Sequence, residues 1–292
     1  MCFSEFQRPF SMTQKCICLD GEGVIWHSGK AIPGSTEVIS QMKALGFRTI
    51  VITNNASRSS EQYVERFVRN GYNDFSAKDV ITSAVTVANR LIKLRFHLPG
   101  RKVFVLGTDG FVSQLTRVNI NVVTPKDFEG IDIHEMELDP EICAVVVGSS
   151  EEFSYIHLTI ATRFVIENDA TLFSANPDAS YPYNGKVLVP GAYSLAKCIG
   201  SASNREPIAL GKPSPEMLQS VEGYKDIDIK NSWMIGDRIN TDISFAKQAG
   251  LKSILVLTGV TREEEIAMID PLDRPDFVCK DLQECLEIIK KN

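Results

Sequence analysis

Short apolar runs recur along the chain, and each is bounded by turn or polar residues. Their length and their content of β-branched side chains are typical of buried strands. The segments between them repeat apolar residues at helical spacing. We therefore predict strands in seven segments: 16–20, 48–53, 102–107, 143–148, 171–176, 232–237 and 253–259.

The first helical segment, 35–47, shows the pattern clearly. It begins with Ser35, an N-cap candidate, and repeats apolar residues at Val38, Met42 and Leu45. Strands that alternate with helices build right-handed βαβ units, whose parallel sheet is covered on both faces. The predicted fold class is therefore α/β, with a doubly wound parallel sheet.

The middle of the chain has its own series of strands and helices, which separates the early strands from the late ones. An inserted second domain explains this order. We predict a core formed by residues 12–99 and 205–292 and a large α/β insert at residues 100–204. Residues before about Met12 have a mixed composition and are expected to form a frayed extension.

Composition restricts the partners. The chain has 292 residues, 43% of them hydrophobic, and a net charge of -6, so we expect no nucleic-acid partner.

The seven cysteines lack zinc-site spacing, and Cys16 and Cys18 lie in an apolar run, so buried free thiols in a reducing compartment are expected. No signal peptide or membrane span is evident, which predicts a cytoplasmic protein without a membrane partner.

Polar residues stand at the ends of several predicted strands. Asp20, Thr53 and Asp237 each follow an apolar run, and two asparagines follow Thr53. Ligands of such folds bind beyond the carboxyl ends of the strands. Attack on a phosphate monoester needs a metal, a fixed positive side chain and an activated nucleophile, and these residues with Lys212 supply the parts.

The motifs that contain these residues resemble those of a known family. "CICLDGEGVIW", "FRTIVITNNAS", "LGKPSPEM", "MIGDRINTDISFAKQAG" and "LVLTGVT" occur in this order along the chain. In that order they resemble the haloacid dehalogenase superfamily, close to its phosphoglycolate phosphatase, pyridoxal phosphatase and 4-nitrophenylphosphatase group. The resemblance implies a magnesium-dependent phosphoric monoester hydrolase with a large cap domain inserted in its core.

The resemblance also implies roles for single residues. Asp20 would be the nucleophile and a Mg²⁺ ligand, and Asp237 the second acidic ligand. Thr53 and Asn54 would donate hydrogen bonds to the phosphoryl oxygens, and Lys212 would neutralise their developing charge.

Two further residues would support this site. Asn55 would brace the loop, and Asp242 would orient Lys212 or the waters of the metal. Taken alone, "TNN" after a strand is also typical of a helix N-cap.

Glu22 departs from the family pattern, which has Asp at this position. The family residue protonates the leaving-group oxygen, later activates water, and gives its backbone carbonyl to Mg²⁺. Glu22 keeps the carbonyl and the acid chemistry, but its additional methylene moves the carboxyl by roughly 1 Å, and such misplacement can cost about a hundredfold in rate. An active phosphatase and a catalytically weak phosphate-ester-binding relative therefore both remain hypotheses.

The implied substrates are small phosphorylated molecules: phosphoglycolate, pyridoxal phosphate, glycerol phosphate or 4-nitrophenyl phosphate. Ser150 and Tyr193 replace residues usual in the family, and Tyr193 is expected to add bulk near the pocket or to be accommodated structurally. A homodimer through the cap is a further expectation from the family. A dinucleotide-binding protein is disfavoured, because no Gly-x-Gly-x-x-Gly follows the first strand.

Overall fold

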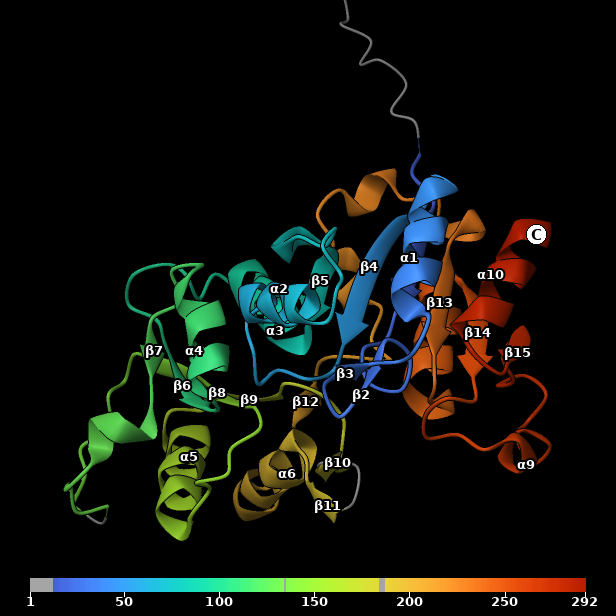
Figure 1. Ribbon diagram of the computed structural model, residues 1–292. Coiled ribbons are helices and arrows are strands. Elements are labelled where there is room, and N and C mark those ends of the chain that lie inside the picture. The colour runs from blue at the N-terminus through green and yellow to red at the C-terminus, as the bar shows by residue number, and fades with distance from the viewer. Residues whose placement is uncertain (1–12, 134, 184–186) are drawn as a thin grey trace, which may run out of the picture.

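Two parallel sheets organise the chain in the computed structural model, which describes residues 13–133, 135–183 and 187–292 (Figure 1). The expectation of a frayed extension before Met12 lies outside these residues. The first sheet has the strand order β15-β14-β13-β1-β4-β5. In that order its strands are Phe277–Cys279, Lys252–Val256, Trp233–Gly236, Cys16–Leu19, Arg48–Thr53 and Val80–Thr82.

Helices cover both faces of this sheet. Ile17 and Leu19 face the layer that contains α1, α2 and α10, whereas Cys16 and Cys18 face α7 and α8. Because alternate side chains of β1 are buried on opposite faces, its sequence is continuously apolar. The helices of this part are α1 (Ser35–Ala44), α2 (Ser60–Arg69), α3 (Ser83–Lys93), α7 (Glu216–Gln219), α8 (Ser244–Ala249), α9 (Glu263–Ile266) and α10 (Leu282–Lys291).

The second sheet has the order β12-β9-β8-β6-β7 and lies beside the first, with α2 and α3 between them (Figure 1). Apolar residues of α3 and α4 pack on one of its faces and those of α5 and α6 on the other. Its elements are β6 (Lys102–Leu106), α4 (Asp109–Thr116), β7 (Val122–Val123), β8 (Ile142–Val147), α5 (Tyr155–Glu167), β9 (Thr171–Ser174), α6 (Ala192–Ser203) and β12 (Ile208–Ala209).

Short elements complete the chain. Two antiparallel hairpins pair β2 with β3 and β10 with β11. They comprise Trp26–His27, Lys30–Ala31, Ser180–Tyr183 and Val187–Pro190. Single helical turns are η1 (Ala77–Asp79), η2 (Pro125–Phe128), η3 (Tyr224–Asp226), η4 (Ile229–Asn231) and η5 (Ile239–Ile243).

All seven predicted strands are present, and the parallel α/β architecture is confirmed. The N-cap assignment of Ser35 is wrong: Gly34, with a φ of 82°, caps α1, and the Ser35 hydroxyl instead bonds to Tyr72. Leu45 lies beyond the helix and is exposed, because α1 ends at Ala44. The "TNN" motif caps no helix, since Ser59 caps α2.

The structure also bears on the expectations for the cysteines, for membrane spans and for the domain boundaries. Cys16 and Cys18 are buried, and the six cysteines of the described residues are free thiols. None of the described helices is long and apolar enough to cross a membrane. The second sheet takes in β12, four residues beyond position 204, so the domain boundaries given above stay predictions.

Candidate active site

Three adjacent strands bring the predicted polar residues to one edge of the first sheet. In β1, Leu19 is paired with Ile235 of β13 and with Val51 of β4. Asp20 and Asp237 directly follow β1 and β13, and Thr53 is the last residue of β4. Parallel strands therefore place these side chains at the same sheet edge, as the sequence predicted.

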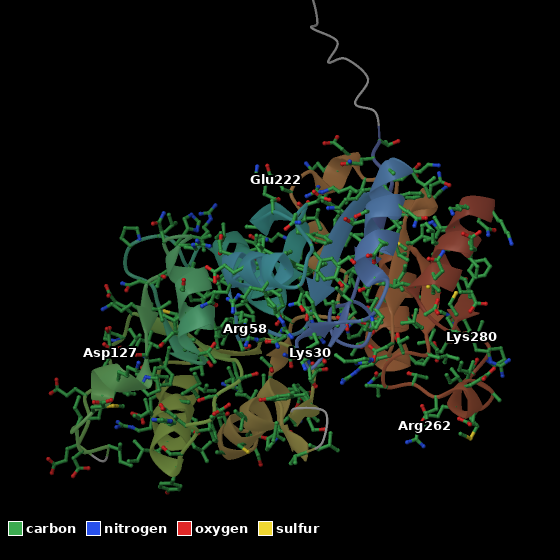
Figure 2. All side chains as sticks on the ribbon, viewed as in Figure 1. Lys30, Arg58, Asp127, Glu222, Arg262 and Lys280 are labelled. Carbon is green, nitrogen blue, oxygen red and sulfur yellow. The ribbon has the colours of Figure 1, made fainter. Side chains whose placement is uncertain are left out.

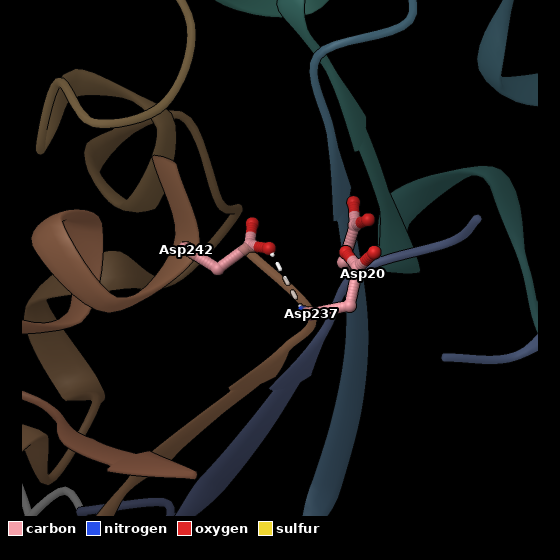
Figure 3. Close-up of side chains that lie close together, drawn as sticks. All are labelled: Asp20, Asp237 and Asp242. Atoms are coloured by element: carbon pink, nitrogen blue, oxygen red, sulfur yellow. Dashed lines mark hydrogen bonds between the residues drawn. The ribbon is translucent and has the colours of Figure 1, made fainter. Parts of the chain in front are cut away.

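A cluster of three carboxylates lies at this edge. Oxygen atoms of Asp20, Asp237 and Asp242 lie within 4.8 Å of one another, and no described histidine or cysteine joins them. Figure 3 shows Asp20 and Asp237 side by side at the strand ends, with Asp242 reaching toward them from η5. One Asp242 oxygen accepts hydrogen bonds from the backbone N–H groups of Asp237 and Arg238, at 3.1 and 3.0 Å. This fixes the loop that presents Asp237.

Lys212 connects two members of the cluster. Its Nζ lies 2.5 Å from Asp20 Oδ1 and 2.7 Å from Asp242 Oδ1, and the side chain is only 2% exposed. Burial lowers the pKa of Lys212, but the charges of Asp20 and Asp242 outweigh burial and raise the pKa above its ordinary value. The charged ammonium form is therefore favoured beside Asp20.

The two strand-end carboxylates have raised pKa values. Burial raises the pKa of Asp20 to about 6; Lys212 opposes this rise and Asp242 adds to it. Burial, with the charges of Asp242 and Asp20, raises the pKa of Asp237 to about 7. The Lys212 ammonium group alone does not neutralise the three carboxylates, and a second cation bound beside them would offset the remaining negative charge.

The residues present fit a magnesium ion. Asp237 Oδ1 is buried and has no hydrogen-bond partner among the described residues, although Oδ2 accepts the Val260 N–H at 2.7 Å. A buried oxygen without a donor is costly unless a ligand binds it. Carboxylate oxygens are the ligands that Mg²⁺ prefers. Space around Asp237 is also restricted, since a Cβ at Gly259 would lie 2.0 Å from its Oδ2.

Asn54 supports Lys212 rather than facing the cleft freely. Its Oδ1 accepts the Lys212 N–H at 2.6 Å, and its Nδ2 donates to the Lys212 carbonyl at 3.1 Å. The Asn54 carbonyl in turn accepts from the side chains of Asn176 and Ser83, each at 2.7 Å. The Asn54 side chain is therefore already engaged with the Lys212 backbone.

The residues on either side of Asn54 shape the loop. Thr53 Oγ1 accepts the Asn55 N–H at 3.2 Å, and Asn55 Oδ1 accepts from the Ser57 N–H and hydroxyl at 2.8 and 2.6 Å. Asn55 thus has the contacts of a loop brace. The Thr53 hydroxyl also hydrogen-bonds with the side chain of Tyr63.

Glu22 lies in the same cleft, but its carboxylate contacts the β2–β3 hairpin. Oε1 accepts the Ser28 N–H at the hairpin turn, and Oε2 lies 3.9 Å from Arg66 Nη2. The side chain is 52% exposed. In this structure the Glu22 carboxylate therefore lies against the hairpin and Arg66.

A cleft of about 1550 Å³ opens above these residues and is also lined from the second sheet, at Ser149 and Ser150. Tyr193 is not part of the lining; its hydroxyl donates to Glu206 at 2.9 Å. Of the two interpretations of Tyr193 given above, structural accommodation fits this position. Two further arginines line the cleft, Arg58 and Arg66. They could not be predicted from the sequence, because surface arginines are common and neither lies in a motif.

Comparison with known proteins agrees with this geometry. Residues 17–121 match the profile of the haloacid dehalogenase-like hydrolase family, and residues 209–285 match a second profile described as HAD-hydrolase-like. The 4-nitrophenylphosphatase of Schizosaccharomyces pombe is 32% identical over 277 residues, which cover 92% of each chain. The chain belongs to the haloacid dehalogenase-like hydrolases.

Other members of this hydrolase family are similar over most of the chain. Chronophin of Rattus norvegicus is 33% identical, over 85% of this chain and 78% of its own. Among solved structures, a glycerol phosphate phosphatase of Mycobacterium tuberculosis in complex with magnesium superposes with a TM-score of 0.78 at 28% identity, over 92% of this chain and 76% of its own. The predictions of family, fold class and phosphoric monoester hydrolase class agree with these relatives.

Proposed function

We propose that this hydrolase is a Mg²⁺-dependent phosphatase that cleaves small phosphate monoesters through a phospho-aspartate on Asp20. The main support is the position of Lys212, whose ammonium group lies between Asp20 and Asp242 at 2.5 and 2.7 Å. A buried cation beside a nucleophilic carboxylate can attract a phosphoryl group and stabilise the charge of its transition state.

The carboxylates of Asp20 and Asp237 and the backbone carbonyl of Glu22 would hold the Mg²⁺ ion, and Asp242 would orient Lys212 or the metal's waters. When bound, the ion offsets the negative charge of the phosphoryl oxygens and of the attacking carboxylate. The unpartnered Asp237 Oδ1 supports this assignment, because the protein supplies no hydrogen-bond donor there within its described residues.

The reaction has two steps. In the first, an Asp20 carboxylate oxygen bonds to phosphorus, the ester P–O bond breaks, and the leaving oxygen takes a proton from the Glu22 carboxyl group. In the second, Glu22 accepts a proton from water, the water oxygen bonds to phosphorus, and the bond to Asp20 breaks to release phosphate. Lys212, the Thr53 hydroxyl and the Asn54 backbone N–H bind the phosphoryl oxygens in both steps.

The proposal extends to the surroundings of the reaction. Substrates would be of the phosphoglycolate, pyridoxal phosphate, glycerol phosphate or 4-nitrophenyl phosphate type. Residues 100–204 would form a cap that excludes water, which strengthens the electrostatic contacts of the site. A cytoplasmic location and a homodimer through the cap complete the proposal.

A second candidate function is a catalytically weak phosphate-ester-binding protein. The contacts of Glu22 favour it, since the carboxylate bonds to the Ser28 N–H and lies near Arg66 instead of facing the site of the leaving group. Without general acid–base catalysis the rate would fall by roughly 10² to 10⁴. Phosphate-ester binding by Lys212 and Thr53 would persist.

Turnover of a phosphate-ester panel, with Mg²⁺ and with a chelator, tests the proposal. We expect Mg²⁺-dependent phosphate release by the wild type and a loss of at least about 10³ in Asp20→Asn, because the nucleophile is removed. Asp169→Asn, an exposed carboxylate paired with Arg205, is the matched control and should keep full activity. If Asp20→Asn turned over the esters as fast as the wild type, the phospho-aspartate route would be excluded. If the wild type bound the esters without turnover, the second function would be favoured.

A further inference from the structure

Two arginines of the cleft, Arg58 and Arg66, have little neutralising charge around them. Arg58 makes neither an ion pair nor a side-chain hydrogen bond within the described residues, whereas Arg66 has only Glu22, at 3.9 Å. The other cations of this wall differ, because Arg69 lies 3.4 Å from Glu65 and Lys126 lies 3.6 Å from Asp109. On this wall Arg58 therefore has no carboxylate partner within the described residues, and Arg66 has a distant one.

The backbone of Arg58 is fixed against the N-terminal end of α4. The preceding Ser57 carbonyl accepts the Thr108 hydroxyl at 2.9 Å, and a Cβ at Gly110 would lie 3.0 Å from the Arg58 Cα. Figure 2 shows Arg58 in the region between α2 and the second sheet. These contacts hold Arg58 at the cleft without using its guanidinium group.

Arg66 is oriented by its own neighbours. Its guanidinium carbon lies 4.4 Å from the centre of the buried Trp26 ring. Burial lowers the pKa of Arg66, and the nearby charge of Arg58 lowers it further. Two neighbouring guanidinium groups repel each other, and an anion between them would relieve this repulsion.

The pair lies close to the phosphoryl site. Arg58 is three residues beyond Asn55, which braces the Thr53 loop. Tyr63 connects the two regions: its hydroxyl hydrogen-bonds with Thr53, and burial raises its pKa to about 12 against the charges of Arg66 and Arg58. A small molecule could therefore contact the Thr53 loop with one end and the arginines with the other.

We propose that Arg58 and Arg66 bind a second anionic group of the substrate, so that the preferred substrates are small phosphate monoesters with a further carboxylate or phosphate. This inference rests on the proposed phosphatase function and narrows its substrate class. Guanidinium groups suit this role because their planar N–H donors match the oxygens of both anions.

Three esters with the same two-carbon framework test the proposal: 2-hydroxyethyl phosphate, phosphoglycolate and ethylene glycol bisphosphate. We expect the wild type to prefer the charged esters in kcat/KM. In Arg58→Gln the ratio of kcat/KM for each charged ester to that for 2-hydroxyethyl phosphate should fall by about 10- to 100-fold, the value of one charge-assisted hydrogen bond. Loss with one charged ester alone would identify which anion the subsite accepts.

Arg69→Gln is the matched control, because Arg69 lines the same wall but is paired with Glu65; its ratios should equal those of the wild type. An unchanged ratio in Arg58→Gln, or no preference in the wild type, would overturn the subsite. Calorimetric binding of the esters to Mg²⁺-loaded Asp20→Asn, with and without Arg58→Gln, gives the same comparison without turnover. This binding comparison tests the subsite even if the wild type hydrolyses none of the three esters. Such a lack of hydrolysis would refute the phosphatase function but not the subsite.

Discussion

Asn54 and Lys212 lie 158 positions apart in the sequence and exchange two hydrogen bonds, from the Lys212 N–H to Asn54 Oδ1 and from Asn54 Nδ2 to the Lys212 carbonyl. The ammonium group of the same lysine contacts Asp20 and Asp242. Asn54 thus determines where the Lys212 backbone lies, and the backbone determines whether the ammonium group can reach Asp20. An amide placed after β4 thereby positions a charge that comes from a distant segment.

Asn54→Ala should destabilise the protein, because it leaves a buried N–H and a buried carbonyl of Lys212 without their partners. Each such group costs about 1–3 kcal/mol, so we expect the free energy of unfolding to fall by about 2–6 kcal/mol in urea titrations. Asn55→Ala is the control. Asn55 is exposed and bonds only within its loop, so the free energy of unfolding of this variant should fall by less than about 1 kcal/mol. Equal losses in the two variants would contradict the bracing role of Asn54.

The raised carboxylate pKa values predict an unusual pH dependence of the metal-free protein. The ordinary pKa of both groups is 3.8, whereas burial raises the pKa of Asp237 to about 7 and that of Asp20 to about 6. Between these values the folded state binds protons that the unfolded chain does not. The free energy of unfolding should therefore rise as the pH falls from about 8 to about 5.

Unfolding titrations in chelator and in saturating Mg²⁺ check this pH dependence. Protons compete with the ion for the same oxygens, so the stabilisation by Mg²⁺ should shrink over the same range. Asp237→Asn should flatten the profile in chelator. If the free energy of unfolding of the wild type in chelator fell as the pH was lowered from about 8 to about 5, the pKa values of these carboxylates would not be raised as described.

Much of the site could be predicted from sequence because it follows from sheet topology. Asp20, Thr53 and Asp237 end apolar runs, and parallel strands bring such ends together. Lys212 and Asp242 follow no such rule, and only the family motifs pointed to them. Their contact depends on a loop and on η5, whose conformations no local periodicity specifies.

The contacts of Glu22 and Arg58 could not be predicted in this way. The sequence showed an additional methylene at Glu22 but not that the Ser28 N–H would bind its carboxylate, since the hairpin turn is tertiary information. Arg58 lies just outside the "FRTIVITNNAS" motif, and its importance depends on the absence of a carboxylate partner among the described residues. Side-chain partners across loops are set by packing, which sequence spacing does not reveal.

The role of Glu22 can be tested with two leaving groups. An alkoxide needs a proton to leave, whereas 4-nitrophenolate is a stable anion, so Glu22→Gln should slow release of an alkyl alcohol by roughly 10² to 10⁴ and release of 4-nitrophenol much less. Hydrolysis of the phospho-aspartate also needs Glu22 as base. Rapid mixing of Glu22→Gln with 4-nitrophenyl phosphate should therefore show a burst of about one 4-nitrophenolate per active site, followed by slow turnover.

If the hairpin contacts hold Glu22 away from the reaction, the outcome differs. Wild type and Glu22→Gln should then release both leaving groups at the same low rates, without a burst. Glu22→Asp should be faster than either, because the shorter side chain cannot reach Ser28 as easily.

Gly259 is the position where a single methyl group should remove metal binding. A Cβ there would lie 2.0 Å from Asp237 Oδ2 and 2.4 Å from its Cγ, so Gly259→Ala must displace this carboxylate from the Val260 N–H. We expect the thermal stabilisation by Mg²⁺ to disappear and turnover to fall by at least about 10², because a displacement near 1 Å is enough. Gly46→Ala controls for glycine replacement: its φ of 87° makes alanine costly, by about 1 kcal/mol, but its Cβ meets nothing within 4 Å. It should lower the melting temperature and keep the full Mg²⁺ shift, and a full shift in Gly259→Ala would place the ion away from Asp237.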